Sequence, residues 1–298
     1  QMLFRPLRQI ADKFNTLQMG MVAAKRVFEI LDSNYYIRDN GNFNLKDLDG
    51  DIIFENVNFS YTRNNNVLNN VNLTIKKGEK IAIVGATGSG KSTIVKLIMR
   101  LYDIEEGEIK INNKNIKNFK LRDLRSSISL VNQDIFLFAD TILKNITLFN
   151  KNVSKKDVEK AAQKIGVLNF INKLPGGFNY DVKERGVMLS EGQRQIISFL
   201  RAYVSKPNIL ILDEATSSID SKTEELIQFA TNKIIQNKTS IIIAHRLSTI
   251  ISADKIVVFK SGKIMEMGSH NDLISNNGYY KKLYESQFEK KELFAEIF

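Results

Sequence analysis

Residues 81–92 read Ile-Ala-Ile-Val-Gly-Ala-Thr-Gly-Ser-Gly-Lys-Ser, an apolar run followed directly by the pattern G-x-x-x-x-G-K-S. Four apolar residues before a glycine-rich turn predict a short buried strand, and a helix is expected to begin near Lys91. Backbone N–H groups in such a turn bind anions, together with the positive end of the helix dipole. The stretch therefore predicts an α/β fold with a phosphate-binding loop. The alternative, a strand–helix turn without a ligand, is disfavoured because every fixed position matches.

The phosphate-loop pattern also assigns roles to individual residues. Lys91 is expected to reach the β- and γ-phosphates of a nucleotide, and the Ser92 hydroxyl to hold Mg²⁺. The residues of this stretch expected to contact the nucleotide are Gly85, Thr87, Gly88, Ser89, Gly90, Lys91, Ser92 and Thr93.

Three further apolar runs end in polar side chains. They are the runs 129–132, 209–212 and 241–244, which lead into Gln133, into Asp213 and Glu214, and into His245. Ligands bind outside the carboxyl ends of the strands in an open α/β sheet. We therefore expect these side chains to face one phosphate group.

Transfer of a phosphoryl group to water requires charge neutralisation and an oriented water molecule. The Asp213 carboxylate suits the Mg²⁺ shell, and Glu214 is the candidate general base. His245 is expected to donate a hydrogen bond to the γ-phosphate, and Gln133 to contact both the water and the metal. In isolation a Gln or His at a strand end is more often a surface or capping residue. Their occurrence at successive strand ends favours the catalytic interpretation, in which Lys91 also takes part.

Residues 189–195 read Leu-Ser-Glu-Gly-Gln-Arg-Gln and predict a capped helix start. Ser190 and Gln193 have the spacing of a capping box before the apolar residues 196–204. A helix N-terminus displayed toward solvent, with a flexible Gly192, would be a second device for binding phosphate. One chain thus carries a nucleotide-binding loop and a separate half-site.

These residues resemble the nucleotide-binding domain of an ABC transporter of the exporter type. Residues 189–193 match that family's signature motif except that Glu191 replaces its usual glycine, and Tyr61 matches the aromatic residue that stacks on adenine. Residues 218–220, with Asp220, resemble the D-loop, and residues 184–186 and 245–249 are exporter-like. The resemblance covers roughly residues 50–285 and rests on five motifs in the family's order.

The resemblance implies a P-loop NTPase (RecA-like) core with an antiparallel β subdomain and an inserted α-helical subdomain. It implies an ATPase that uses ATP and Mg²⁺. It also implies a second nucleotide-binding domain, identical or different, placed head-to-tail so that Ser190, Gly192, Gln193 and Asp220 reach the nucleotide. The remaining implied partner is the transmembrane domain of a full-length chain, which would place this domain at the cytoplasmic face of a membrane and make it drive substrate export.

Apolar residues organise the N-terminal segment. Leu3, Leu7, Ile10, Phe14, Leu17, Met21, Ala24 and Phe28 recur at spacings of four and three. Such a stripe is typical of a coiled-coil-like helix, and packing on the protein's own core is the alternative. In the exporter family this place is taken by the extension of the last transmembrane helix, so the resemblance implies that residues 1–32 extend from a transmembrane domain that lies upstream. Residues 33–50 are expected to form a linker, 51–285 the ATPase domain with its helical subdomain at about 134–200, and 286–298 a tail.

Composition limits the remaining classes of function. The formal net charge of +10 arises from 43 basic and 33 acidic residues, yet no nucleic-acid-binding module is evident, so we expect no nucleic-acid partner. With no cysteine and two histidines, a structural zinc site is disfavoured. An ABC-type ATPase acting on nucleic acid or ribosomes would need a coiled-coil insertion or a second phosphate loop. A non-hydrolysing module would lack Glu214 or His245, and the N-terminal stripe argues against an importer subunit.

Overall fold

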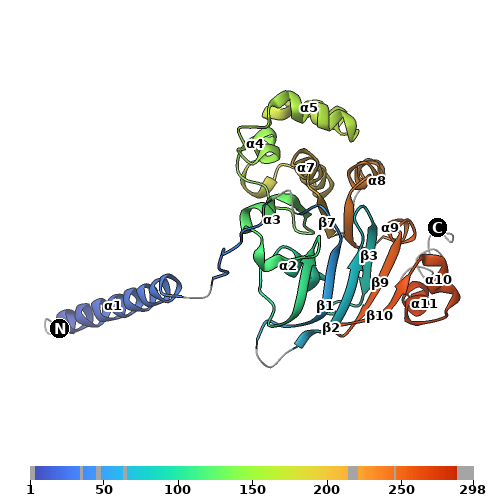
Figure 1. Cartoon of the computed structure of the whole chain (residues 1–298). Helices are drawn as coiled ribbons and strands as arrows, with labels where there is room; N and C mark the ends of the chain where they lie inside the picture. The colour runs from blue at the N-terminus through green and yellow to red at the C-terminus, as the bar shows by residue number, and fades with distance from the viewer. Residues whose placement is uncertain are drawn as a thin grey trace. The chain divides into compact units, whose positions relative to one another are not determined.

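The computed structural model describes residues 4–33, 36–44, 48–62, 66–213, 221–244 and 246–286. The chain divides into two compact units, Gln1–Arg38 and Asp39–Phe298 (Figure 1). The second unit contains two β-sheets and all of the described helices except the first.

A six-stranded sheet forms the centre of the second unit, in the order β10-β9-β3-β8-β7-β6. Its strands are β3 (Lys80–Gly85), β6 (Ile128–Val131), β7 (Ile209–Asp213), β8 (Thr239–Ile243), β9 (Lys255–Lys260) and β10 (Lys263–Gly268). All neighbours pair in parallel except β9 and β10. Parallel strands buried on both faces consist of nearly continuous Val, Ile and Leu, which is the pattern that identified β3, β7 and β8 in the sequence.

A second, four-stranded sheet has the order β2-β1-β4-β5 and is antiparallel throughout. Its strands are β1 (Ile52–Ser60), β2 (Asn66–Ile75), β4 (Glu106–Ile111) and β5 (Lys114–Asn115). The expected antiparallel β subdomain is therefore present beside the parallel core.

Alternate residues of β3 enter two different hydrophobic cores. Ile81 and Ile83 pack with the antiparallel sheet and with α2 (Lys91–Ile98). Ala82 and Val84 pack in the cluster that contains α7 (Glu191–Val204) and α8 (Ser221–Ile235). The central sheet is thus covered on both faces, which holds the loop after β3 between two rigid layers.

The chain between β6 and β7 is mainly helical, as the sequence predicts. It contains α4 (Ile142–Thr147), α5 (Lys155–Lys164), α6 (Leu168–Asn172), two short 3₁₀ turns (Gly177–Asn179 and Glu184–Gly186) and α7. Ser154 caps α5 through a capping box with Asp157, and Ser190 caps α7 through one with Gln193. The sequence predicts the box at Ser190 as the start of α7.

The other helices are short and peripheral. They are α3 (Leu121–Ser127), α9 (Leu247–Ile251), α10 (His270–Ser275) and α11 (Tyr279–Tyr284), with a 3₁₀ turn at Ile116–Asn118. Within the segment expected to be a linker, Leu48 is buried and Phe43 forms a bridge with Phe119. This part of the segment therefore packs on the second unit.

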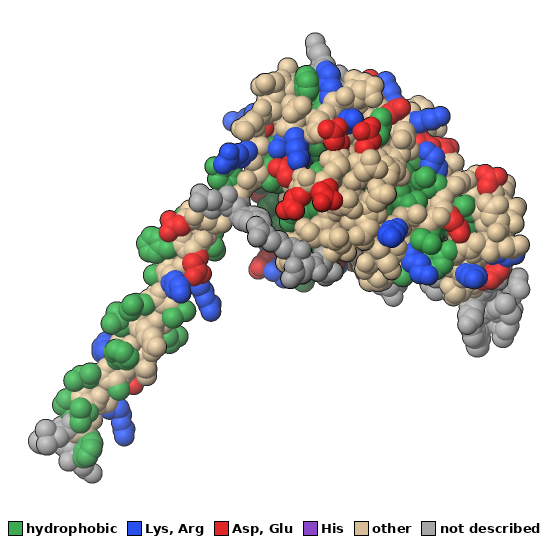
Figure 2. Space-filling model, turned by 60° about the horizontal axis from the view of Figure 1, so that its bottom comes forward, with side chains coloured by type: hydrophobic (Ala, Val, Ile, Leu, Met, Phe, Trp, Pro, Cys, Tyr) green, Lys and Arg blue, Asp and Glu red, His purple; other side chains and the backbone are tan. Residues whose placement is uncertain are grey.

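The first unit is built on α1 (Phe4–Leu31), a helix with no buried residue. The apolar residues of the predicted stripe lie on it, apart from Leu3, which is outside the described residues. Ile10 and Phe14 are 66% and 64% exposed, and Figure 2 shows hydrophobic side chains along the whole helix. In the described parts of the chain, no helix combines the length and the apolar character needed to cross a membrane.

Candidate nucleotide-binding site

The phosphate loop joins β3 to α2 with no side chain capping the helix. Gly90 is the N-cap residue, in a left-handed conformation with φ of 106°, and it cannot supply a cap. The first N–H groups of a helix have no partner within the helix. Ser89 closes a turn by donating its N–H to the Ala86 carbonyl at 3.1 Å, and its own carbonyl accepts from Gly262 N–H at 3.0 Å. The loop is therefore held in shape while the helix start stays open to an anion.

Gly85 and Gly88 of this loop are required for different structural reasons. A Cβ added to Gly85 would lie 2.2 Å from the Phe259 carbonyl oxygen, so this residue permits the close approach of β9. A Cβ on Gly88 would meet nothing within 4 Å, but its φ of +78° is unfavourable for other residues. The space beside Gly88 is therefore open on the side where a phosphate would lie.

Lys91 and Ser89 place buried polar groups in the loop. The Lys91 ammonium donates to the carbonyls of Gly85 at 2.8 Å and Ala86 at 3.0 Å. Burial lowers the pKa of Lys91, and the nearby charge of Asp213 opposes that shift. The Ser89 hydroxyl is buried and has no hydrogen-bond partner among the residues that the structure describes. A buried cation and an unpartnered hydroxyl beside open N–H groups are a donor set suited to a nucleotide phosphate.

The expected strand ends do meet at one edge of the central sheet. The register pairs Ile83 of β3 with Ile243 of β8, and Ile243 with Asp213 of β7. Leu212 pairs with Val131, so the end of β6 continues the same edge. Gln133 follows two residues later and is exposed. Asp213 and Gln133 therefore lie at the edge where β3 enters the phosphate loop.

Three of the predicted site residues lie outside the described residues, namely Glu214, Asp220 and His245. The side chain of Ser92 is exposed at the start of α2, at the same edge as Asp213. No group of three or more His, Cys, Asp or Glu side chains gathers as a metal site among the residues that the structure describes. A hydroxyl, a carboxylate and an amide oxygen nevertheless suit Mg²⁺, which retains several waters when it binds with a nucleotide.

Tyr61 belongs to an aromatic cluster that the sequence did not indicate. Its ring meets Phe59 and Tyr102 edge-on, with centroids 4.9 and 5.0 Å apart, and the Lys96 ammonium lies 5.2 Å from its centroid. The Tyr61 hydroxyl lies 3.1 Å from the Thr93 hydroxyl on α2. Tyr61 is still 41% exposed, so part of the ring remains available to a base. No local pattern links Tyr102 or Lys96 to Tyr61, since both come from later parts of the chain.

The start of α7 has the predicted capping box but does not display Gly192 as expected. The Ser190 N–H donates to the Gln193 side-chain oxygen at 3.0 Å, and the Gln193 N–H donates to the Ser190 hydroxyl at 3.3 Å. Two backbone donors are therefore paired within the cap, as a capping box requires. Gly192 is buried rather than displayed to solvent, whereas Ser190 and Glu191 are exposed. The exposed part of this helix start is the Ser190–Glu191 pair.

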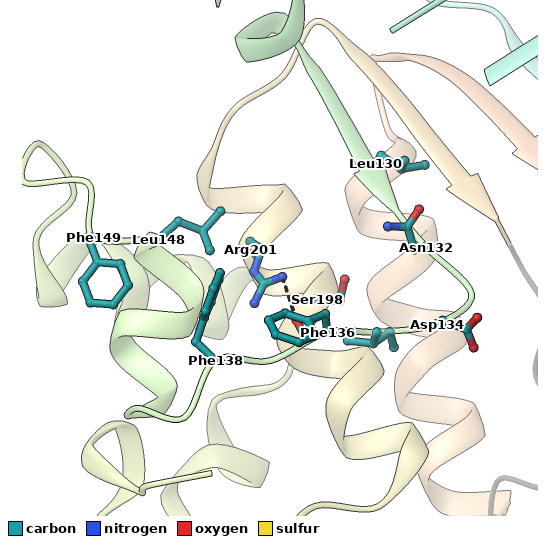
Figure 3. Close-up of a pocket in the computed structure, with 10 residues that line it drawn as sticks. Leu130, Asn132, Asp134, Phe136, Phe138, Leu148, Phe149, Ser198 and Arg201 are labelled. Atoms are coloured by element: carbon teal, nitrogen blue, oxygen red, sulfur yellow. Dashed lines mark hydrogen bonds between the residues drawn. The ribbon is translucent and has the colours of Figure 1, made fainter. Parts of the chain in front are cut away.

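A surface pocket of about 450 Å³ adjoins the segment after Gln133 (Figure 3). Phe136 and Phe138 from that segment, Leu148 and Phe149 after α4, and Arg201 of α7 line it. Arg201 donates to the carbonyls of Asn145 at 2.8 Å and Phe136 at 3.3 Å, and burial lowers its pKa. Sequence reasoning missed this pocket because its aromatic residues follow no periodic pattern.

Comparisons with known proteins agree with this geometry. The ABC transporter family model matches residues 68–217. The chain is 43% identical over 288 residues to the ABC transporter ATP-binding protein YknV of Bacillus subtilis (strain 168), covering 96% of this chain and 48% of that protein. It is likewise 43% identical over 288 residues to the ATP-dependent lipid A-core flippase of Escherichia coli (strain K12), covering 96% of this chain and 49% of the flippase.

A solved structure resembles the chain over the same extent. The ATP-bound structure of a bacterial Atm1-family ABC exporter matches with a TM-score of 0.80 and 36% identity, covering 96% of this chain and 50% of that one. The chain thus spans about half the length of these relatives. Together with the phosphate loop, the two sheets and the helical insertion, these matches place the chain in the ABC transporter family, as an ATPase domain of the exporter type.

Proposed function

We propose that this domain binds ATP with Mg²⁺ at residues 85–93 and hydrolyses the terminal phosphate. The observation that carries the proposal is the buried Lys91 ammonium, which donates to the loop carbonyls of Gly85 and Ala86, beside the Ser89 hydroxyl, which is unpartnered among the described residues. A phosphate oxygen is a stronger partner for the ammonium than a neutral carbonyl. Lys91 can therefore exchange its carbonyl partners for a phosphate oxygen of ATP, and this exchange strengthens ATP binding without a large rearrangement of the loop.

The residues at the edge of the central sheet have different roles in hydrolysis. Ser92, Asp213 and Gln133 hold Mg²⁺, which neutralises phosphate charge when bound. Glu214 takes the proton of the attacking water, and His245 donates a hydrogen bond toward the γ-phosphate. The register that brings the ends of β3, β7 and β8 together supports these roles.

Tyr61 provides the surface on which adenine stacks. The contact with the Thr93 hydroxyl and the edge-on rings of Phe59 and Tyr102 restrict the orientation of its side chain. A ring fixed before binding loses less entropy on stacking. Base stacking alone does not distinguish adenine from guanine, so this contact supports affinity more than specificity.

The working unit is a head-to-tail pair of such domains, identical or different, with each ATP between the phosphate loop of one and the Ser190–Gln193 helix start of the other. The resemblance assigns Asp220 to the same interface. The exposure of Thr87, Gly88 and Ser92 supports the pairing, because this side of the cradle is open. Two half-sites related by a two-fold axis complete each other twice.

The remaining partner is a transmembrane domain in the same full-length protein, which places this domain at the cytoplasmic face of a membrane as the ATPase of an exporter. The relatives' additional length supports this proposal. The surface pocket in Figure 3 suits an apolar segment of the transmembrane domain, because the Phe136 and Phe149 side chains that line it are exposed. Leu148 and Phe149 also have positive φ values of 48° and 60°, strain that persists where it serves a function.

The substitution Glu214→Gln tests the proposed hydrolysis. Glutamine retains the shape and hydrogen bonding of glutamate but cannot accept a proton at neutral pH. Steady-state phosphate release with Mg²⁺ should fall by about 100-fold or more, since general-base catalysis contributes roughly 10²–10⁴-fold. ATP affinity should be retained. Glu225→Gln, which neutralises an exposed carboxylate on α8, is the matched control, and unchanged turnover in Glu214→Gln would overturn the assignment.

A further inference from the structure

A second pocket, of about 490 Å³, lies along α5 and at the ends of two other helices. It is bounded by α5, the end of α7, the end of α8 and the segment 236–238. Figure 1 shows α5 beside α7 and α8 at the same end of the unit, and α5 and α8 each contact α7. A Cβ on Gly166, just beyond α5, would lie 2.8 Å from the Phe229 ring on α8, so these helices pack closely.

Lysines dominate the lining of this pocket, which we call the lysine pocket. They are Lys160, Lys164, Lys206, Lys233 and Lys238, against one lining carboxylate, Asp157. The Asp157 carboxylate already accepts from the Ser154 hydroxyl at 2.6 Å and the Ser154 N–H at 3.0 Å. Hydrogen bonding by Ser154 is the main reason that its pKa is lowered, with smaller contributions from the charges of Lys160 and Lys206.

The lysines of the pocket have few partners of their own. Lys238 donates to the Pro207 carbonyl at 2.7 Å, and Lys233 lies 5.6 Å from the centroid of the Phe229 ring. Within the described part of the chain, Lys160, Lys164 and Lys206 form no ion pair. These three ammonium groups therefore have donors available for a ligand.

A structural explanation for the lysines has to be weighed first. Lysines are favourable at helix C-termini, and α7 and α8 end here, whereas α5 lines the pocket along its whole length. Each helix end carries roughly half a negative charge, so two ends and Asp157 together balance only about two of the five lysine charges. The helix dipoles therefore do not account for the whole cluster, and a positive surplus remains.

The floor of the lysine pocket is apolar. Val153, Ala161, Tyr203 and Val204 line it, each buried or half-buried. A floor of this kind with charged side chains at the rim suits a compact molecule that bears phosphate groups and an apolar or ring portion. The volume lies within the range of roughly 300–1,000 Å³ that is typical of small-ligand sites.

We propose that the lysine pocket is a binding site for a small phosphate-bearing anion, distinct from the nucleotide cradle. The anion is either free in solution or the headgroup of a lipid. The pocket is lined by α5 and α7 of the helical insertion and by α8, which packs against the central sheet. A bound anion therefore stabilises the packing of these three helices. This proposal does not depend on ATP hydrolysis or on pairing of the domain.

Lysine footprinting with an amine-reactive reagent tests the proposal, with tripolyphosphate as the probe at about 150 mM salt. Labelling of Lys160, Lys164 and Lys206 should slow by about threefold or more, while the exposed Lys156 and Lys173 outside the pocket keep their rate. Protection of Lys91 is read separately and reports the nucleotide cradle. The same readout with phosphatidylglycerol vesicles, against phosphatidylcholine vesicles, distinguishes a lipid headgroup from a free phosphate compound.

In the double substitution Lys160→Gln, Lys164→Gln, about tenfold more tripolyphosphate should be needed to protect Lys206 to the same extent. The control Lys156→Gln, Lys173→Gln removes the same charge elsewhere and should leave that protection unchanged. Protection of Lys206 by tripolyphosphate or by phosphatidylglycerol vesicles, lost only in the first variant, supports the proposal. Absence of protection with both probes, equal protection at Lys156 and Lys173, or equal loss in both variants would overturn it.

Discussion

The N-termini of α2 and α7 both present backbone N–H groups at the surface, but only α7 is capped by its own side chains. At α2 the N-cap residue is Gly90, with no side-chain hydrogen bond, beside the buried Lys91. At α7 the Ser190 and Gln193 side chains each accept a backbone N–H in a reciprocal box. We therefore call the uncapped N-terminus of α2 the open start and the capped N-terminus of α7 the closed start.

This difference separates binding from assembly. The open start is suited to hold an anion within one domain, because no side chain caps its first N–H groups. The closed start has already satisfied two donors, so it offers a phosphate less and is stable without one. We infer that the phosphate loop supplies most of the ATP affinity, and that the α7 start acts only when a partner domain brings it against bound nucleotide.

The largest effect is expected at the open start. Lys91→Ala removes the charge that bonds the phosphates, and hydrogen bonds to charged groups contribute roughly 1.5–3 kcal/mol each. Two such bonds correspond to a rise in the ATP dissociation constant of about 100-fold or more, measured by equilibrium titration. Lys263→Ala removes an exposed charge from β10 and should bind as the parent does. Equal affinity of the two variants would contradict the assigned role of Lys91.

Two glycines of the phosphate loop test whether the open start has the described backbone shape. In Gly85→Ala the new Cβ would meet the Phe259 carbonyl at 2.2 Å, so the free energy of unfolding should fall by about 3 kcal/mol. In Gly88→Ala it meets nothing within 4 Å, and only the left-handed backbone costs about 1–2 kcal/mol. Urea unfolding without nucleotide measures both. The reverse order would show that the loop does not have this shape.

The closed start is tested by removing its cap. Ser190→Ala should lower the free energy of unfolding by about 1 kcal/mol, the usual value for a lost N-cap. Ser154→Ala removes the matching capping box from α5 and should cost about the same. Only Ser190→Ala should also weaken ATP-dependent pairing, measured by light scattering. If both variants or neither change the pairing, the special role of the α7 start is wrong.

The smallest effect on stability is expected at Ser89. Its buried hydroxyl has no partner, so Ser89→Ala should change the free energy of unfolding without nucleotide by less than about 0.5 kcal/mol. With ATP the hydroxyl gains a phosphate partner, and the variant should bind several-fold more weakly. Thermal unfolding with and without ATP checks both statements. A large loss of stability without ATP would mean that the hydroxyl already has a partner.

Local patterns in the sequence predicted the parts of the site that lie within a few residues of one another. The strand before Gly85, the helix from Lys91 and the capping box at Ser190 are confirmed. The meeting of strand ends also followed, because parallel strands place their carboxyl ends at one edge. Glu214 and His245 lie outside the described residues, and their roles stay predictions.

The features that the sequence did not predict come from residues far apart along the chain. Tyr102 and Lys96 reach Tyr61 only through folding, and Arg201 bonds Asn145 across two helices of the insertion. The burial of Gly192 depends on the packing around α7, which no spacing reveals. Tertiary packing, not local preference, decides such contacts.

The central claim is that the open start of one domain and the closed start of another share an ATP molecule. The most direct test is the mass in solution of the Glu214→Gln protein with ATP and Mg²⁺, with and without Ser190→Arg. We expect an ATP-dependent dimer that Ser190→Arg abolishes, because the longer side chain would clash at the shared phosphate. Ser154→Arg, at the equivalent cap of α5, should leave the dimer intact. A monomer at high protein concentration, or equal dimerisation with Ser190→Arg, would contradict the account.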